Sequence, residues 1–140
     1  MSRIIYYAGP LFTDAERAWN AANAQRLKNA LPGIDLRLPQ DFCAHLASNQ
    51  KPDYAAIFLA CRTHLEAAQV VVAVVDGADA DSGTAWEMGY ACGRGIPVIA
   101  LRTDWRPAED GAANCMLSRS AQRVCTNLEE VIVALGEILK

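Results

Sequence analysis

Hydrophobic residues gather in short, nearly continuous runs that alternate with longer stretches of mixed polarity. The runs lie at residues 3–9, 34–39, 70–75, 96–101 and 122–126, with glycine, proline or polar residues at their boundaries. Runs of this length, rich in Val, Ile, Leu and Tyr, predict β-strands. The two runs at 70–75 and 96–101 are apolar at almost every position, which is typical of parallel strands buried on both faces.

The stretches between these runs carry the signals of helices. We expect helices within residues 13–33, 53–68, 83–95 and 127–140, and a polar loop at 103–115. A Thr and a Glu three residues later form a capping box at the start of the first helix, and a Pro-Gly pair ends it.

This alternation of strands and helices predicts a single α/β domain over residues 1–140, a three-layer fold with a mostly parallel sheet. The content of 52% hydrophobic and 21% charged residues indicates a folded, soluble protein. A net charge of −3 without any Lys/Arg cluster argues against nucleic-acid binding. The apolar runs are shorter than the roughly 18 residues of a membrane span, and the N-terminus lacks a secretory signal pattern. We therefore expect a cytoplasmic protein without nucleic-acid or membrane partners.

The cysteines and histidines do not form a recognisable metal or disulfide pattern. The two histidines, His45 and His64, lack metal-ligand spacing. The number of cysteines is odd and they are scattered along the chain, which predicts reduced thiols. They are Cys43, Cys61, Cys92, Cys115 and Cys125.

Residues 76–91 directly follow the most apolar run and contain four carboxylates, Asp76, Asp79, Asp81 and Glu87. In parallel sheets, ligands bind outside the carboxyl ends of the strands, where the strand order reverses. This segment lies at such an end, and so does the turn at 8–12 after the first run. The sequence therefore predicts a binding crevice between these two segments.

Glu87 is expected about one turn into a helix, among apolar neighbours, where a carboxylate is oriented and weakly solvated. Such a group suits attack on an electrophilic carbon, and Asp81 on the preceding loop could share the pocket. In the alternative interpretation, Asp81 or Ser82 only caps the helix and Glu87 only interacts with its dipole. Asp76 and Asp79 are expected to be solvated turn residues.

Other residues near the crevice have specific expected roles. Tyr6 and Tyr7 alternate faces, so one should be buried and the other could reach the crevice and contact a carboxylate. Phe12 offers either a wall for a planar ring or a hydrophobic staple on the next helix. Gly83 would let the backbone approach a ligand, and Gly89 would let its helix pack closely on the sheet.

Three motifs, in this order and spacing, resemble those of the nucleoside 2-deoxyribosyltransferase family. They are YYAGPLF at 6–12, DSGTAWEMGYA at 81–91 and NCM at 114–116. The resemblance implies a flavodoxin-like fold and transfer of a 2-deoxyribosyl group between nucleobases, with net retention. The substrates would be 2′-deoxyribonucleosides and free nucleobases, and no metal or organic cofactor is implied.

The resemblance also implies roles for individual residues. Glu87 would attack C1′ and carry a covalent deoxyribosyl ester, Tyr6 would orient Glu87, and Asp81 would hold the sugar hydroxyls or the base. Asn114 and Met116 would reach a neighbouring subunit's site, so the active form would be a homo-oligomer. The remaining predicted substrate-binding residues are Phe12 in the pocket wall, Gln40 near the base, Gly83 beside the sugar, and Cys61.

Cys61 marks a departure from the family, whose members usually have an aspartate at this place that recognises or protonates the base. A thiol is a poor proton donor at neutral pH. Asp81, Asp41 or water could do this work instead, or Cys61 could be a packing residue.

Two rival functions share this fold. An N-glycoside hydrolase of nucleosides or nucleoside 5′-monophosphates would use water in place of the acceptor base, and Arg62, Arg102 and Arg106 could then bind a phosphate. The other rival function is a non-enzymatic nucleoside sensor. A sensor would have no use for Tyr6, Asp81 and Glu87 together.

Overall fold

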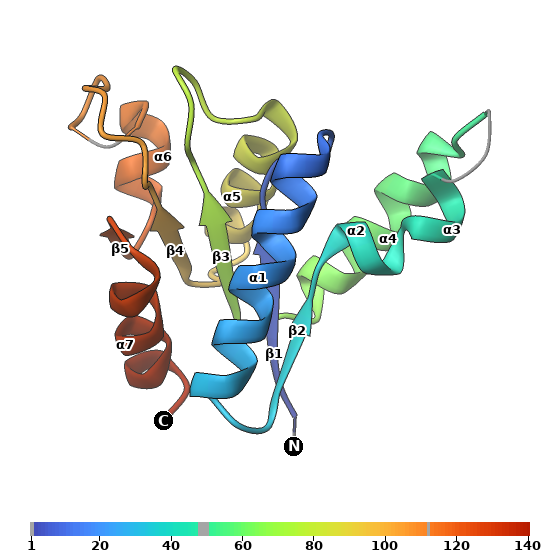
Figure 1. The fold of residues 1–140 in the computed structure, drawn as a ribbon, viewed down its shortest axis with the longest axis horizontal. Helices are drawn as coiled ribbons and strands as arrows, with labels where there is room; N and C mark the ends of the chain where they lie inside the picture. The colour runs from blue at the N-terminus through green and yellow to red at the C-terminus, as the bar shows by residue number, and fades with distance from the viewer. Residues whose placement is uncertain (1, 48–50, 112) are drawn as a thin grey trace.

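The computed structural model describes residues 2–47, 51–111 and 113–140. In this part of the chain, five strands form one parallel sheet in the order β2-β1-β3-β4-β5 (Figure 1). The strands are β1 (Arg3–Ala8), β2 (Ile34–Arg37), β3 (Val70–Val74), β4 (Val98–Leu101) and β5 (Arg123–Cys125). The α/β fold class is confirmed, and the sheet is wholly parallel. This strand order is that of flavodoxin-like folds.

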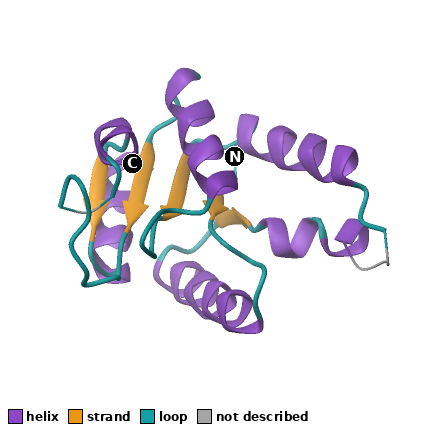
Figure 2. Cartoon of the chain, turned by 90° about the horizontal axis from the view of Figure 1, so that it is seen from above, coloured by secondary structure: helices purple, strands orange, loops and turns teal. Residues whose placement is uncertain are grey.

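Helices cover both faces of the sheet (Figure 2). The long ones correspond to the four predicted helices: α1 (Asp14–Ala30), α4 (Tyr54–Glu66), α5 (Ser82–Gly93) and α7 (Leu128–Ile138). Thr13 caps α1 as predicted, because its side chain accepts a hydrogen bond from the Glu16 N–H.

Three short helices lie in segments without a helical prediction: α2 (Pro39–Phe42), α3 (Ala44–Ala47) and α6 (Cys115–Ser120). The sequence predicted no helix between its second strand and the helix within 53–68, and α2 and α3 correct this. Helices of four to six residues are too short to show a repeating apolar pattern, so only Pro39 at a first turn and the cap Asn114 signalled them.

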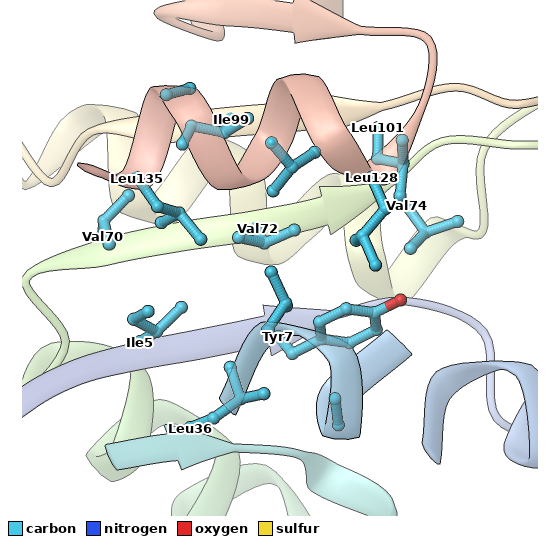
Figure 3. Packing of buried hydrophobic residues seen from close by; sticks show 14 of the residues in the cluster. Ile5, Tyr7, Leu36, Val70, Val72, Val74, Ile99, Leu101, Leu128 and Leu135 are labelled. Carbon is cyan, nitrogen blue, oxygen red and sulfur yellow. The ribbon is translucent and has the colours of Figure 1, made fainter. Parts of the chain in front are cut away.

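Alternation along β1 divides the core into two layers. Ile5 and Tyr7 point toward α1 and α7, as Figure 3 shows for Tyr7 among Val72 and Leu128. Tyr6 and Ala8 point to the other face, which α4, α5 and α6 cover. Neither tyrosine reaches the crevice mouth, because Tyr6 and Tyr7 are 0% and 1% exposed, but Tyr6 contacts the carboxyl group of Glu87.

The centre of the sheet determines where a ligand can bind. β1 and β3 pair in register, with Tyr6 opposite Val71 and Ala8 opposite Ala73. The chain continues to β2 on one side of this pair and to β4 on the other, so the connections diverge above the carboxyl ends of the two strands. Gly9 follows β1 there, and a Cβ on it would lie 3.3 Å from Val74 Cβ, which favours glycine at this close approach.

Two expectations for the acidic segment were wrong. Asp76 is not simply solvated: its carboxylate accepts hydrogen bonds from the backbone of Thr103 and Asp104 and thereby joins the loops after β3 and β4. Gly89 is exposed, and nothing lies within 4 Å of a Cβ placed on it, so close packing does not require glycine there. None of the helices in the described part of the chain is long and apolar enough to cross a membrane.

Candidate active site

A cavity of about 600 Å³ lies beside the carboxyl end of β1, within the size range of about 300–1,000 Å³ that is usual for small-molecule sites. The turn after β1, the segment around α2 and α3, helix α4 and the start of α5 form its walls. The lining residues are Gly9, Leu11, Phe12, Arg17, Pro39, Gln40, Cys43, Ala44, Pro52, Tyr54, Ile57, Cys61, Asp81, Gly83 and Glu87.

The cavity brings together most of the residues that the sequence predicted for the site. Six of them line it: Phe12, Gln40, Cys61, Asp81, Gly83 and Glu87. Tyr6 lies beneath the cavity, in contact with Glu87. Asn114 and Met116 do not line it.

Glu87 lies in the second turn of α5 and directs its carboxyl group into the cavity wall. Its Oε2 atom is buried and has no hydrogen-bond partner in the described part of the chain. Burial raises the pKa of this carboxyl to about 7, the Tyr6 hydroxyl lowers it, and the charge of Asp81 raises it. The result is an acidic group that changes its charge near neutral pH.

The Tyr6 hydroxyl is buried against Glu87 and Cys61. Desolvation, followed by the negative charge of Glu87, raises the pKa of Tyr6 far above its ordinary value, so the hydroxyl stays protonated. The contact is close enough to lower the pKa of Glu87, although it does not reach the geometry of a full hydrogen bond among the described residues.

Asp81 has a structural role as well as a place in the cavity. Its Oδ2 atom accepts hydrogen bonds from the Thr84 N–H at 2.9 Å and the Thr84 hydroxyl at 3.1 Å, so it caps α5. A Cβ on Gly83 would lie 3.2 Å from the same Oδ2, so a larger residue would press on the capping carboxylate.

A hydrogen-bond network that the sequence did not reveal holds together the wall of the cavity that the turn after β1, α1 and α2 form. The buried Asn20 amide donates to the Pro10 carbonyl at 2.9 Å and to Gln40 Oε1 at 3.0 Å. Gln40 donates to the Arg17 carbonyl, and the Arg17 guanidinium donates to the carbonyls of Leu11 and Phe12. No motif in the sequence signalled this network, because it joins the turn after β1, α1 and α2.

Cys61 lines the cavity, and its sulfur lies 3.9 Å from that of Cys43. Burial raises the pKa of both thiols, that of Cys43 to about 12. Asp41, which was considered as a proton donor to the base, is not among the described residues that line the cavity.

The residues that resemble the third motif lie apart from the cavity. Asn114 caps α6 by accepting a hydrogen bond from the Met116 N–H, and the Met116 side chain is 75% exposed. The arginines considered for a phosphate do not line the cavity either. Arg102 donates to the carbonyls of Val75, Gly77 and Arg106, whereas Arg62 pairs with Glu66 and Arg106 with Asp104.

The arrangement suits nucleophilic chemistry on a small molecule. Within residues 2–47, 51–111 and 113–140, no three His, Cys, Asp or Glu side chains gather closely enough to hold a metal ion. A partly buried carboxylate beside a protonated tyrosine, in a mainly apolar cavity, can attack an electrophilic carbon while the walls limit access of water.

The chain matches one protein family and resembles several solved structures. The profile of the family described as nucleoside 2-deoxyribosyltransferase matches residues 5–130. A search of curated proteins found no match. A conserved protein from Enterococcus faecalis V583 is 29% identical, with a TM-score of 0.86, over 98% of this chain and 99% of that one.

Two further solved structures share the fold. A 2-deoxyribosyltransferase from Bacillus psychrosaccharolyticus is 20% identical, with a TM-score of 0.76, over 92% of this chain and 90% of its own. The CMP N-glycosidase BcmB from Clostridium botulinum is 14% identical, with a TM-score of 0.57, over 96% of this chain and 98% of its own.

Proposed function

Because the chain belongs to the nucleoside 2-deoxyribosyltransferase family, we propose that it transfers the 2-deoxyribosyl group of a nucleoside from one nucleobase to another. The observation that carries this proposal is Glu87, a carboxylate with a buried, unpartnered oxygen in the wall of a cavity of suitable size. Tyr6 beside it, and Asp81 in the same cavity, supply the other groups that the reaction needs.

The proposed reaction has two displacements at one carbon. A Glu87 oxygen attacks C1′, the bond from C1′ to the base nitrogen breaks, and its electron pair leaves with the base, which takes up a proton from water. The nitrogen of a second base then attacks C1′, loses its proton to water and breaks the ester, which returns Glu87 to its carboxylate form. Each step inverts C1′, so the product retains the starting configuration.

The other cavity residues would position the substrate. Tyr6 would donate to Glu87 and hold the attacking oxygen toward C1′. Asp81 uses Oδ2 to cap α5, and its carboxylate would also accept hydrogen bonds from sugar hydroxyls. Phe12 and Gln40, which the Asn20 network holds in place, would flank the base.

We further propose that the active form is a homo-oligomer in which Asn114 and Met116 contribute to a neighbouring subunit's site. These residues lie outside the cavity of their own chain and are exposed. An aromatic patch on α4 and α5 supports assembly: Phe58 and Trp86 are 49% and 45% exposed, and their ring centroids are 5.4 Å apart. Exposed aromatic residues of this kind are common at protein interfaces.

Hydrolysis is the second candidate. Water could attack the same ester, and the thiol of Cys61 offers an incoming base little help in binding. Arg62, Arg102 and Arg106 are engaged elsewhere. The guanidinium of Arg17, which lines the cavity, donates to the carbonyls of Leu11 and Phe12 and pairs with Asp14, so a nucleoside is favoured over a 5′-monophosphate as the substrate.

Incubation with 2′-deoxyinosine and free adenine, followed by chromatography, tests the proposal. Formation of 2′-deoxyadenosine supports transfer, whereas hypoxanthine released at a rate independent of adenine supports hydrolysis. Glu87→Ala should abolish turnover without loss of folding, and wild-type turnover in this variant would exclude Glu87 as the nucleophile. Absence of turnover with any deoxynucleoside or deoxynucleotide contradicts both candidates.

A further inference from the structure

Two thiols meet in the wall of the cavity. Cys43 follows α2 and Cys61 lies within α4, and their sulfurs are 3.9 Å apart. Both residues line the cavity, together with Phe12 and Tyr54, whose side chains are 70% and 75% exposed. Cys61 is half-buried and Cys43 is buried, so a small solute that enters the cavity reaches the Cys61 sulfur.

We propose that Cys43 and Cys61 form a modification site, at which a hydroperoxide oxidises the two thiols to a disulfide that fixes one wall of the cavity. Bond formation requires the sulfurs to approach from 3.9 Å to about 2.0 Å. Cys43 lies between two helices of four residues each, which constrain the backbone less than a long helix does. Rotation of the two side chains and a small shift of this segment can supply the movement.

Cys61 is the thiol that should react first, because it is half-buried whereas Cys43 is buried. Burial and the charge of Glu87 raise the pKa of Cys61, and the neighbouring Tyr6 hydroxyl and Cys43 thiol lower it in part. The Cys61 thiolate attacks one peroxide oxygen and breaks the O–O bond, which gives a sulfenic acid and one water. The Cys43 sulfur then attacks Cys61 Sγ and expels a second water. In total, two thiols and one hydrogen peroxide yield one disulfide and two waters.

The net effect of burial on the two thiols makes this reaction slow, because the thiolate is the reactive form. Brief exposure to peroxide should therefore leave the pair reduced, and sustained exposure should oxidise it. Once formed, the disulfide lies away from the exposed surface of the chain, so reduction should require a small reductant that enters the cavity.

The disulfide would change the cavity because of what lies between the two cysteines. The segment from 43 to 61 includes Ala44, Pro52 and Tyr54, which together with Ile57 line one side. Cross-linking its ends restricts this wall and draws the Cys61 sulfur toward Cys43. Since a displacement of about 1 Å in a catalytic site can cost about a hundredfold in rate, oxidation should lower turnover. This effect on activity rests on the proposed function, whereas disulfide formation does not.

Peptide mass spectrometry of the full chain, before and after treatment with hydrogen peroxide, tests the proposal. Trypsin should release residues 38–62 as one peptide, because Pro52 protects the bond after Lys51. In the oxidised protein this peptide should lose the mass of two hydrogen atoms and bind no alkylating reagent. Base-exchange turnover should fall at least about tenfold, and dithiothreitol should restore both properties.

Two variants make the result specific. Cys92→Ser is the matched control, because Cys92 is exposed and does not line the cavity, and it should form the disulfide as the wild type does. Cys43→Ala should lose no hydrogen mass and should instead gain oxygen on Cys61. The proposal is overturned if the peptide stays reduced while Cys92 is oxidised, or if the disulfide forms and leaves turnover unchanged. If the reduced wild type shows no turnover, the proposed function is contradicted. The proposed disulfide is still tested in that case, because the peptide mass shows whether it forms.

Discussion

Glu87 combines two properties that oppose each other, a charged working form and a buried position. The proposed nucleophile is the carboxylate, but burial raises the pKa of this group from its ordinary value of 4.5 to about 7. The fraction of active enzyme should therefore increase as the pH rises through about 7. The same burial weakens solvation of the carboxylate and so leaves it more reactive toward carbon.

The pH dependence of Tyr6→Phe tests the pairing of Tyr6 with Glu87. The Tyr6 hydroxyl lowers the pKa of Glu87, so its removal should move the acidic limb of kcat/KM to higher pH by about one pH unit. Turnover at high pH should also fall, by about tenfold or more, because the attacking oxygen is no longer oriented. Pre-steady-state or steady-state profiles between pH 5 and about 9 measure both effects. An unchanged limb would show that Tyr6 does not act on Glu87, and Tyr7→Phe, on the other face of β1, is the control.

Replacement of Glu87 by glutamine should stabilise the fold at alkaline pH. With a folded-state pKa near 7 and an ordinary value of 4.5, the folded protein binds the proton more tightly than the unfolded chain does. The free energy of unfolding of the wild type should thus be highest below about pH 4.5 and should decrease until about pH 7. Glu87→Gln removes this loss, so at pH 8 it should be more stable by on the order of 2 kcal/mol.

Urea unfolding at pH 5 and pH 8 measures the difference, and a constant ΔΔG between the two would contradict the raised pKa. Glu129→Gln, which removes an exposed ion pair between α7 and Arg26 of α1, should cost no more than about 1 kcal/mol at either pH. Activity of Glu87→Gln should be lost at both.

At the scale of the element, α5 depends on the same carboxylate that faces the cavity. Asp81→Asn keeps an oxygen that can accept from the Thr84 N–H, so the free energy of unfolding should change by only a few tenths of a kcal/mol, whereas Asp81→Ala should lose about 1 kcal/mol. If the charge also holds the sugar, both variants should lower kcat/KM by about tenfold or more. Wild-type kcat/KM in Asp81→Asn would restrict Asp81 to capping. Asn127→Ala removes the cap of α7, far from the cavity, and should cost stability but not activity.

The strands and the long helices were predictable because each carries a repeating pattern. Val70–Val74 is apolar throughout and lies in the centre of the sheet, and Thr13 with Glu16 marked the start of α1. The helices α2 and α3 have only four residues each, so no period could appear. The order of the strands followed from no local pattern, since it depends on which connections cross the sheet.

The residues of the candidate site could be predicted where they lie together in one sequence motif. Residues that meet only through tertiary contacts could not. Asp81, Gly83 and Glu87 lie within one strand-to-helix junction, and the sequence places them together. The contact between Cys43 and Cys61 joins residues 18 positions apart through the packing of α3 on α4, which no spacing rule indicates. Asn20 similarly belongs to no motif in the sequence, although it is 4% exposed and holds Gln40.

At the scale of the whole molecule, the two faces of the sheet differ in how completely they are covered. The face under α1 and α7 encloses a continuous core around Tyr7 and Val72 (Figure 3). The other face carries the cavity, and its helices present Phe58, Trp86 and Met116 to solvent. An assembly of chains through this second face would cover the aromatic rings and bring exposed residues toward a neighbouring cavity.

Mixing two inactive variants tests whether neighbouring chains share a site. Glu87→Ala lacks the proposed nucleophile, and Met116→Ala lacks a 75% exposed side chain that would serve the neighbour's cavity. If sites are shared, chains mixed one to one and allowed to exchange should regain about a quarter of the wild-type turnover, because that share of sites combines an intact Glu87 with an intact neighbouring Met116. Val133→Ala replaces an exposed hydrophobic residue on α7, outside the assembly face, and should be fully active alone. Turnover in the mixture that does not exceed the sum of the two separate variants, with subunit exchange verified by mass, would assign each site to a single chain.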